Sequence, residues 1–269
     1  MFAKRTLLIS LLTLLSLLPL AARESENTLS SSWVSFRDEL TSNYIVSLDT
    51  DRHGTIWIGT ADGMNSFDGV AVSRYTKNSG ALSSNELNAV IADRFRDRVW
   101  FASKRNGLGC YDWKTGKASF LRSGGTPDIP SDEITDIFQD RRGDIWFSTY
   151  TEGICRYDPN ENTITRFWQG NVSGLQQGVI RRFCISQDGK IYVAFYGEGI
   201  AVIDPHTMTA IPFMHNAENP NSLPSNQIGS IYIDRTMSGW VHVMDSRCSV
   251  LSPRISPYST RRTLAFREN

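Results

Sequence analysis

The sequence lacks an excess of charge of either sign: Lys and Arg together number 28, and Asp and Glu together also number 28. A neutral chain has no net field that would draw it to nucleic acid or to an anionic membrane surface, so we expect no nucleic-acid partner. The four histidines and four cysteines are scattered rather than clustered at metal-ligand spacing. We therefore expect no metal site, and the sequence offers no catalytic residues and no cofactor-binding motif.

Long hydrophobic runs are also missing after the first twenty residues. Lys4 and Arg5 precede an apolar stretch from Thr6 to Leu20, and small residues follow it up to Ala22. This order is typical of a secretory signal peptide, and the stretch is short for a full membrane span. We expect residues 1–22 to be cleaved and the mature chain to be periplasmic, with no membrane attachment. The competing interpretation is an uncleaved anchor.

What the sequence does contain is one strand-rich unit repeated five times, at intervals of 42 to 48 residues. Each unit begins with a turn such as Leu82-Ser-Ser-Asn-Glu-Leu87, followed by an apolar run and a charged turn. A large aromatic residue then occupies the same strand position in every unit: Trp57, Trp100, Trp146, Tyr192 and Trp240. A period of this length with four short strands per unit is typical of β-propeller blades.

The predicted fold is all-β, a β-propeller of about five four-stranded blades. The repeats are expected over residues 40–81, 82–128, 129–174, 175–222 and 223–253. Residues 23–39 are an N-terminal segment in which Trp33 to Phe36 could complete the last blade as a ring-closing strand. Residues 254–269 are expected to be an irregular tail.

The repeated aromatic residues are expected to pack between neighbouring sheets, since each blade must bury its faces against the next. Cys110 and Cys155 lie in equivalent strands but one position out of phase, so strand alternation would point them to opposite faces. We therefore expect the cysteines to be small buried hydrophobic residues rather than disulfides.

Two segments carry a resemblance to a known family. Asp51 to Gly69 reads as an Asp-x-x-Gly turn, an apolar-Trp-apolar strand, a glycine and an aromatic-Asp pair, and Asp140 to Asp158 repeats this order. Both resemble the two-component regulator propeller repeat, and the resemblance covers about Leu40 to Pro253. The whole is similar to the N-terminal periplasmic sensor region of hybrid two-component systems.

The resemblance implies a domain that senses fragments of complex polysaccharides. It also implies about seven blades per ring, so five blades would form an open arc or part of such a ring. The kinase, receiver and DNA-binding regions of such sensors do not appear in this sequence, so we expect a truncated sensor or a free periplasmic propeller without signalling catalysis.

The candidate binding residues lie in the loops between the second and third strands of each unit. These loops differ between units, whereas the Asp-x-x-Gly turns are nearly uniform. Tyrosine can stack on a sugar ring, and Lys or Arg can bind hydroxyl or acidic groups. We predict that Lys104, Arg105, Tyr150 and Tyr196 contribute to an oligosaccharide site. The competing interpretation of each residue is an ordinary solvated loop.

Two alternatives remain open. Tyr157-Asp-Pro159 is similar to a turn of streptogramin-lyase-like propeller enzymes, but His53, His206 and His242 fall in different units, with no matched carboxylate. The other alternative is a structural protein-interaction propeller, in which a homodimer could cover the edges of an incomplete ring.

Overall fold

The computed structural model describes residues 39–219, 222–223, 225–234, 240–245, 250–253 and 266–267. The chain divides into two units, residues 1–36 and 37–269, and everything described here belongs to the second. The expected signal peptide and the strand expected from Trp33 to Phe36 lie outside the described residues. Among the described residues, no helix has the length and apolarity needed to cross a bilayer.

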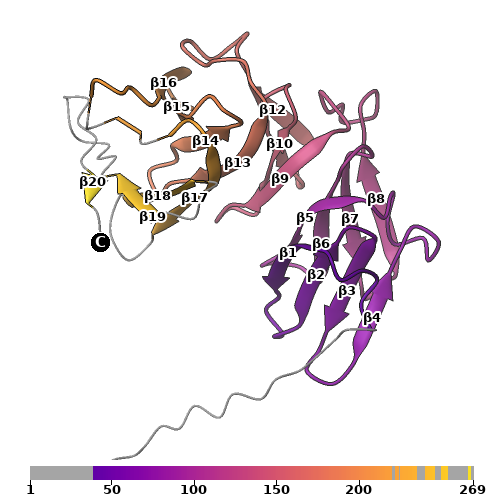
Figure 1. Cartoon of the computed structure of the whole chain (residues 1–269). Helices are drawn as coiled ribbons and strands as arrows, with labels where there is room; N and C mark the ends of the chain where they lie inside the picture. Colours follow the sequence, from indigo (N-terminus) through magenta and orange to yellow (C-terminus); the bar gives the residue numbers. More distant parts are fainter. Residues whose placement is uncertain are drawn as a thin grey trace, which may run out of the picture. The chain divides into compact units, whose positions relative to one another are not determined.

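The described strands form five four-stranded antiparallel sheets, as the sequence predicts (Figure 1). In chain order the first sheet holds β1 (Ile45–Thr50), β2 (Ile56–Thr60), β3 (Gly63–Phe67) and β4 (Val72–Tyr75). The second holds β5 (Leu87–Ala92), β6 (Arg98–Ser103), β7 (Leu108–Asp112) and β8 (Lys117–Leu121). The third holds β9 (Ile134–Gln139), β10 (Ile145–Thr149), β11 (Ile154–Asp158) and β12 (Thr163–Phe167). The fourth holds β13 (Ile180–Ile185), β14 (Ile191–Phe195), β15 (Ile200–Asp204) and β16 (Thr209–Phe213). The fifth holds β17 (Ile228–Asp234), β18 (Trp240–Asp245), β19 (Val250–Pro253) and β20 (Phe266–Arg267).

The four strands of each sheet are called a, b, c and d in chain order, and each sheet is one blade. Consecutive blades contact one another through their a strands: β1 packs beside β5, β5 beside β9, β9 beside β13, and β13 beside β17. Within the described residues the sheets are not closed into a ring, in agreement with the expected open arc. Strand d of the fifth blade, β20, comes from the segment that was expected to be irregular.

The core is divided into layers between neighbouring blades. Trp57 and Met64 of the first blade pack on Val90 and Phe101 of the second. Equivalent clusters lie between the second and third, the third and fourth, and the fourth and fifth blades. Because each layer needs both blades, the blades stabilise one another in series along the chain.

The predicted packing role of the repeated aromatics is confirmed for four of the five positions. Trp57, Trp100, Trp146 and Tyr192 are at most 5% exposed. The side chain of Trp240 lies outside the described residues. Each of the three described tryptophans also donates its indole N–H to the aspartate that opens its a–b turn, so the polar edge of the buried ring is satisfied.

In the fourth blade a serine takes the place of the aspartate that opens the a–b turn. Ser186 stands at the position that Asp51 has in the first blade. The Ser186 hydroxyl accepts the N–H of Lys190 at 3.0 Å, as the Asp51 carboxylate accepts the N–H of Thr55. The aromatic partner in this blade is Tyr192, which has no indole N–H to donate.

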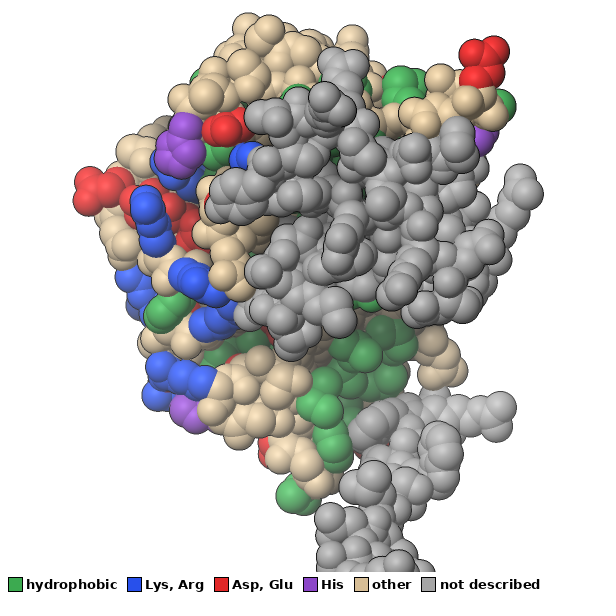
Figure 2. Space-filling model, turned by 90° about the vertical axis from the view of Figure 1, so that its left-hand side faces the viewer, with side chains coloured by type: hydrophobic (Ala, Val, Ile, Leu, Met, Phe, Trp, Pro, Cys, Tyr) green, Lys and Arg blue, Asp and Glu red, His purple; other side chains and the backbone are tan. Residues whose placement is uncertain are grey.

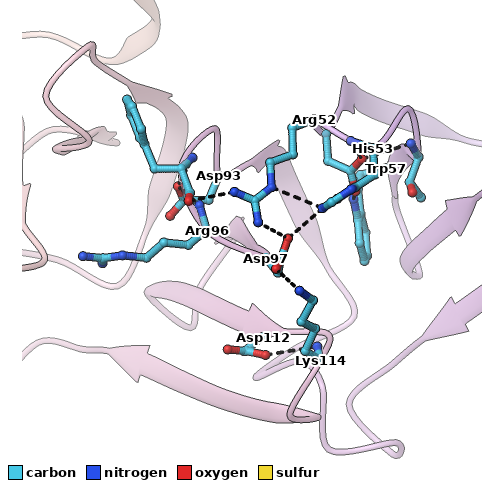
Figure 3. A network of polar contacts seen from close by, with 11 residues as sticks. Arg52, His53, Trp57, Asp93, Arg96, Asp97, Asp112 and Lys114 are labelled. Carbon is cyan, nitrogen blue, oxygen red and sulfur yellow. Dashed lines mark hydrogen bonds and ion pairs between the residues drawn. The ribbon is translucent and has the colours of Figure 1, made fainter.

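The a–b turns of the first two blades and the c–d turn of the second are joined by a polar network centred on Asp97 (Figure 3). Its carboxylate accepts from Arg52 at 2.7 Å, from His53 at 2.9 Å and from Lys114 at 2.5 Å. The hydrogen bond from Lys114, followed by those from His53 and Arg52, holds the pKa of Asp97 well below its ordinary value. Basic and acidic side chains are likewise interspersed along one edge of the face in Figure 2.

Glycine is required after strand b for a steric reason. Gly107 has φ of +72°, and a Cβ there would lie 2.1 Å from the carbonyl oxygen of Leu121 in strand d. Its N–H donates to the carbonyl of Asp132, in the connection that leads to the next blade, at 2.9 Å. A side chain at this position would therefore disturb both its own blade and the link to the next one.

Candidate functional site

The loops that carry the predicted site residues are held by one repeated main-chain hydrogen bond. In each of the first four blades, the first residue after strand b donates its N–H to the carbonyl of the residue that precedes strand a. These pairs are Ala61 to Tyr44 (3.0 Å), Lys104 to Glu86 (3.0 Å), Tyr150 to Glu133 (2.9 Å) and Tyr196 to Val179 (2.8 Å). Each of these four blades therefore presents two adjacent side chains on the same face.

A β-bulge at the start of strand a adds a third side chain. In β5 the register shifts between Leu87 and Ala89, so Asn88 has no partner in β6. In β13 the same shift occurs between Ile180 and Arg182, which leaves Arg181 as the extra residue. Bulges turn a side chain away from the alternation of its strand. Here both extra residues line the loop face, where Arg181 is exposed and Asn88 is half-buried.

These side chains surround one cavity of about 1110 Å³. All four predicted residues, Lys104, Arg105, Tyr150 and Tyr196, line it. The two tyrosines are 47% and 57% exposed, so their rings are accessible to a ligand. The volume suits a ligand of several sugar units, because sites for drug-sized molecules span ~300–1,000 Å³.

The predicted residues are held differently within the cavity. The ammonium of Lys104 lies 3.9 Å from the carboxylate of Glu86, both well exposed to solvent, so this ion pair is weak. The guanidinium of Arg181 lies over the ring of Tyr196, 5.2 Å from its centroid. The Arg105 side chain is exposed, and it makes no hydrogen bond or ion pair with the other described residues.

Sequence reasoning missed the half of the cavity that comes from the start of strand a. Glu86, Glu133, Arg181 and Arg182 all line the cavity. The prediction rests only on the loops between the second and third strands of each unit, so it does not include these residues. The adjacent pair Arg181-Arg182, at a position that is Asn88-Ala89 in the second unit, was an available signal.

Beneath the cavity, Asp136 of β9 joins the third blade to the fourth. Its carboxylate accepts the N–H of Phe183 at 3.4 Å and lies 3.9 Å from the guanidinium of Arg182. Burial raises the pKa of Asp136 to about 6, and the nearby Arg182 only partly offsets this effect.

Two of the three histidines considered for an enzyme, His53 and His206, lie away from this cavity, and the side chain of His242 lies outside the described residues. His53 is in the a–b turn of the first blade, bonded to Asp97, and His206 is in the c–d turn of the fourth blade. His206 lines a second cavity of about 550 Å³, together with Arg141 and Arg142. Within the described ranges, no group of three or more His, Cys, Asp or Glu side chains could hold a metal ion.

Comparison with known families supports the resemblance found in the sequence. The family model described as two component regulator propeller matches residues 39–62 and 128–151. These matches cover the start and b strand of the first repeat and the equivalent part of the third. The chain therefore carries two-component regulator propeller repeats. No curated protein matches the sequence.

Solved structures with the same fold include two extracellular domains of hybrid two-component systems from B. thetaiotaomicron. One aligns with a TM-score of 0.73 at 23% identity, over 87% of this chain and 32% of its own length. The second aligns with a TM-score of 0.62 at 17% identity, over 74% of this chain and 26% of its own. The chain thus spans about a third or less of these structures, and the likeness establishes a shared propeller fold.

A virginiamycin B lyase from Staphylococcus aureus has a related fold. It aligns with a TM-score of 0.56 at 13% identity, over 79% of this chain and 70% of the lyase.

Proposed function

We propose that this chain, with its two-component regulator propeller repeats, is the periplasmic ligand-binding region of a two-component signalling protein and recognises an oligosaccharide. The ligand would occupy the cavity lined by Lys104, Arg105, Tyr150 and Tyr196. In this proposal the chain binds and does not catalyse, and any kinase activity would reside elsewhere in the signalling protein.

The observation that supports this proposal is the convergence of variable loops on one cavity. Tyr150 and Tyr196 come from adjacent blades, yet both rings line the same cavity and both are accessible. Accessible aromatic rings bind the apolar faces of sugars, while Lys and Arg side chains bind hydroxyl groups at the rim. The opposite face instead carries the a–b turns, and the aspartates that open them in the first three blades accept hydrogen bonds from buried tryptophans.

The experiment is calorimetric titration of the purified chain with a panel of plant and animal oligosaccharides. For a sugar that binds, the Tyr150→Ala and Tyr196→Ala variants should each bind about tenfold more weakly, because each loses a stacking surface. Phe95→Ala is the matched control, since Phe95 is an aromatic residue of similar exposure, 52%, in an a–b turn. Unchanged affinity in both tyrosine variants would remove this cavity from consideration.

A lyase is the second candidate, because the fold of the virginiamycin lyase aligns with 79% of this chain. Such an enzyme needs a general base close to a group that stabilises the leaving atom. His206, beside Arg141 in the second cavity, would be the residue to examine. Loss of a streptogramin substrate on incubation with the chain, abolished by His206→Ala, would favour this function over ligand binding.

A further inference from the structure

The cavity is positively charged although the chain as a whole is neutral. Its charged lining residues are four basic side chains, Lys104, Arg105, Arg181 and Arg182, and two acidic ones, Glu86 and Glu133. The surplus of two positive charges is concentrated within one concave surface, where low-dielectric walls strengthen its field.

The positive charges differ in how well they are already neutralised. Lys104 has Glu86 at 3.9 Å, and Arg182 has Asp136 at 3.9 Å. Arg105 and Arg181 have no acidic partner within 4.0 Å among the described residues. These two guanidinium groups, from the second and fourth blades, are therefore the ones most available to a ligand.

Arg181 is also oriented by its neighbour. Its guanidinium lies over the Tyr196 ring, 5.2 Å from the centroid, a cation–π contact that helps to position the group. A guanidinium with free edges binds carboxylate and sulfate oxygens in a two-point arrangement that an ammonium cannot reproduce. A neutral sugar offers no group of matching charge.

Resting on the proposed function, we infer that the ligand is an acidic oligosaccharide, with a carboxylate or sulfate held between Arg105 and Arg181 while the tyrosines contact its sugar rings. The basic residues then select for charge, and Tyr150 and Tyr196 contribute binding that does not depend on charge.

The test is calorimetry of the purified chain with matched ligands. Trigalacturonate carries carboxylates, its fully methyl-esterified form has the same backbone without charge, and a chondroitin sulfate tetrasaccharide adds sulfate groups. At least one acidic sugar should bind tenfold or more tightly than the neutral ester, and its affinity should fall as salt is raised. Preference for trigalacturonate identifies a carboxylate, and preference for the tetrasaccharide that is lost with the unsulfated chondroitin tetrasaccharide identifies sulfate.

The variant Arg105→Gln/Arg181→Gln should lose this preference while keeping its melting temperature. The single variant Arg181→Lys should keep only part of the preference for the acidic sugar, because it keeps the charge without the planar guanidinium group. Arg141→Gln/Arg142→Gln is the matched control, with the same charge change in an a–b turn.

The possible failures can be distinguished. If the neutral ester binds as tightly as the acidic sugars, the inference about charge is wrong and the proposed oligosaccharide site stands. If the acidic preference survives in the Arg105/Arg181 double variant, these residues do not hold the acidic group. If no sugar of either class binds, the proposed function fails together with the inference.

Discussion

The indole N–H of Trp57 donates to the Asp51 carboxylate at 3.0 Å, and this hydrogen bond ties strand b of the blade to its a–b turn. The other carboxylate oxygen accepts the N–H groups of His53 and Thr55, at 2.8 and 3.0 Å. One side chain therefore shapes the a–b turn and also satisfies the buried tryptophan of strand b. The same arrangement recurs with Asp140 and Trp146.

Replacing this aspartate should destabilise the protein. Asp51→Ala leaves the Trp57 indole and turn N–H groups without acceptors, so we expect the free energy of unfolding in urea to fall by about 1–3 kcal/mol. Glu161→Ala, an exposed acidic residue in a c–d turn, is the control and should change it by less than about 0.5 kcal/mol. Equal effects of the two substitutions would show that the pairing contributes nothing to stability.

The fourth blade allows the pairing to be built where it is missing. Ser186→Asp and Tyr192→Trp recreate the two partners. The free energy of unfolding of the double variant should be about 1 kcal/mol higher than the value obtained by adding the two single-variant changes to the wild type. Urea unfolding of the four proteins in the cycle measures this coupling. A coupling of zero would mean that the turn geometry of this blade does not bring the two groups together.

The glycine after strand b should tolerate no side chain. At Gly107 a Cβ would meet the Leu121 carbonyl at 2.1 Å, so Gly107→Ala should cost roughly 3 kcal/mol or more or prevent folding. Gly116→Ala is the control: φ there is +69°, but nothing lies within 4 Å of the added atom. This variant should cost only the ~1–2 kcal/mol of the left-handed backbone. Melting temperatures of the two variants test the difference.

The raised pKa of Asp136 should make stability depend on pH. Its pKa is about 6 when folded and close to 3.8 when unfolded, so the unfolded chain binds fewer protons between these values. The stability of the wild type should therefore fall as pH rises from 4 to 6, relative to Asp136→Asn, by about 2 kcal/mol. Urea unfolding of both proteins across this window measures the difference, and parallel pH profiles would contradict the assignment.

The buried thiols should be unreactive in the folded protein. Burial raises the pKa of Cys110 and of Cys155 to about 12, and it also raises that of Cys184. In a Cys248→Ser variant, which removes the one cysteine outside the described residues, a thiol reagent should react slowly until denaturant is added. Three thiols should then react, because the three described cysteines are free. Fewer than three would indicate a disulfide in solution.

Much of the fold could be predicted because the repeat aligns the chain with itself. The third unit, expected over residues 129–174, contains the four strands β9 to β12 between Ile134 and Phe167. The sequence alone does not show that Ser186 is the equivalent of Asp51, because the pair Asp188-Gly189 resembles the turns of the other units more closely. Hydrogen-bond geometry, rather than residue type, identifies the equivalent position.

The candidate site was only half predictable for a related reason. Tyr150 and Tyr196 stood out because their loops vary between otherwise similar units. Arg181 did not, because a residue inside a strand is expected to follow the alternation of its neighbours, and the sequence does not reveal the β-bulge that exposes it.

By itself, the sequence determined the period, the four strands of each of the first four blades and the residues that pack between those blades, because these depend on local alternation and on contacts repeated from unit to unit. Only the tertiary structure decided which side chains meet. Arg105 and Arg181 lie more than seventy residues apart in the chain, and they share one cavity because successive blades turn the same loop face toward it. Contacts of that kind depend on how the blades pack against one another, which no single repeat encodes.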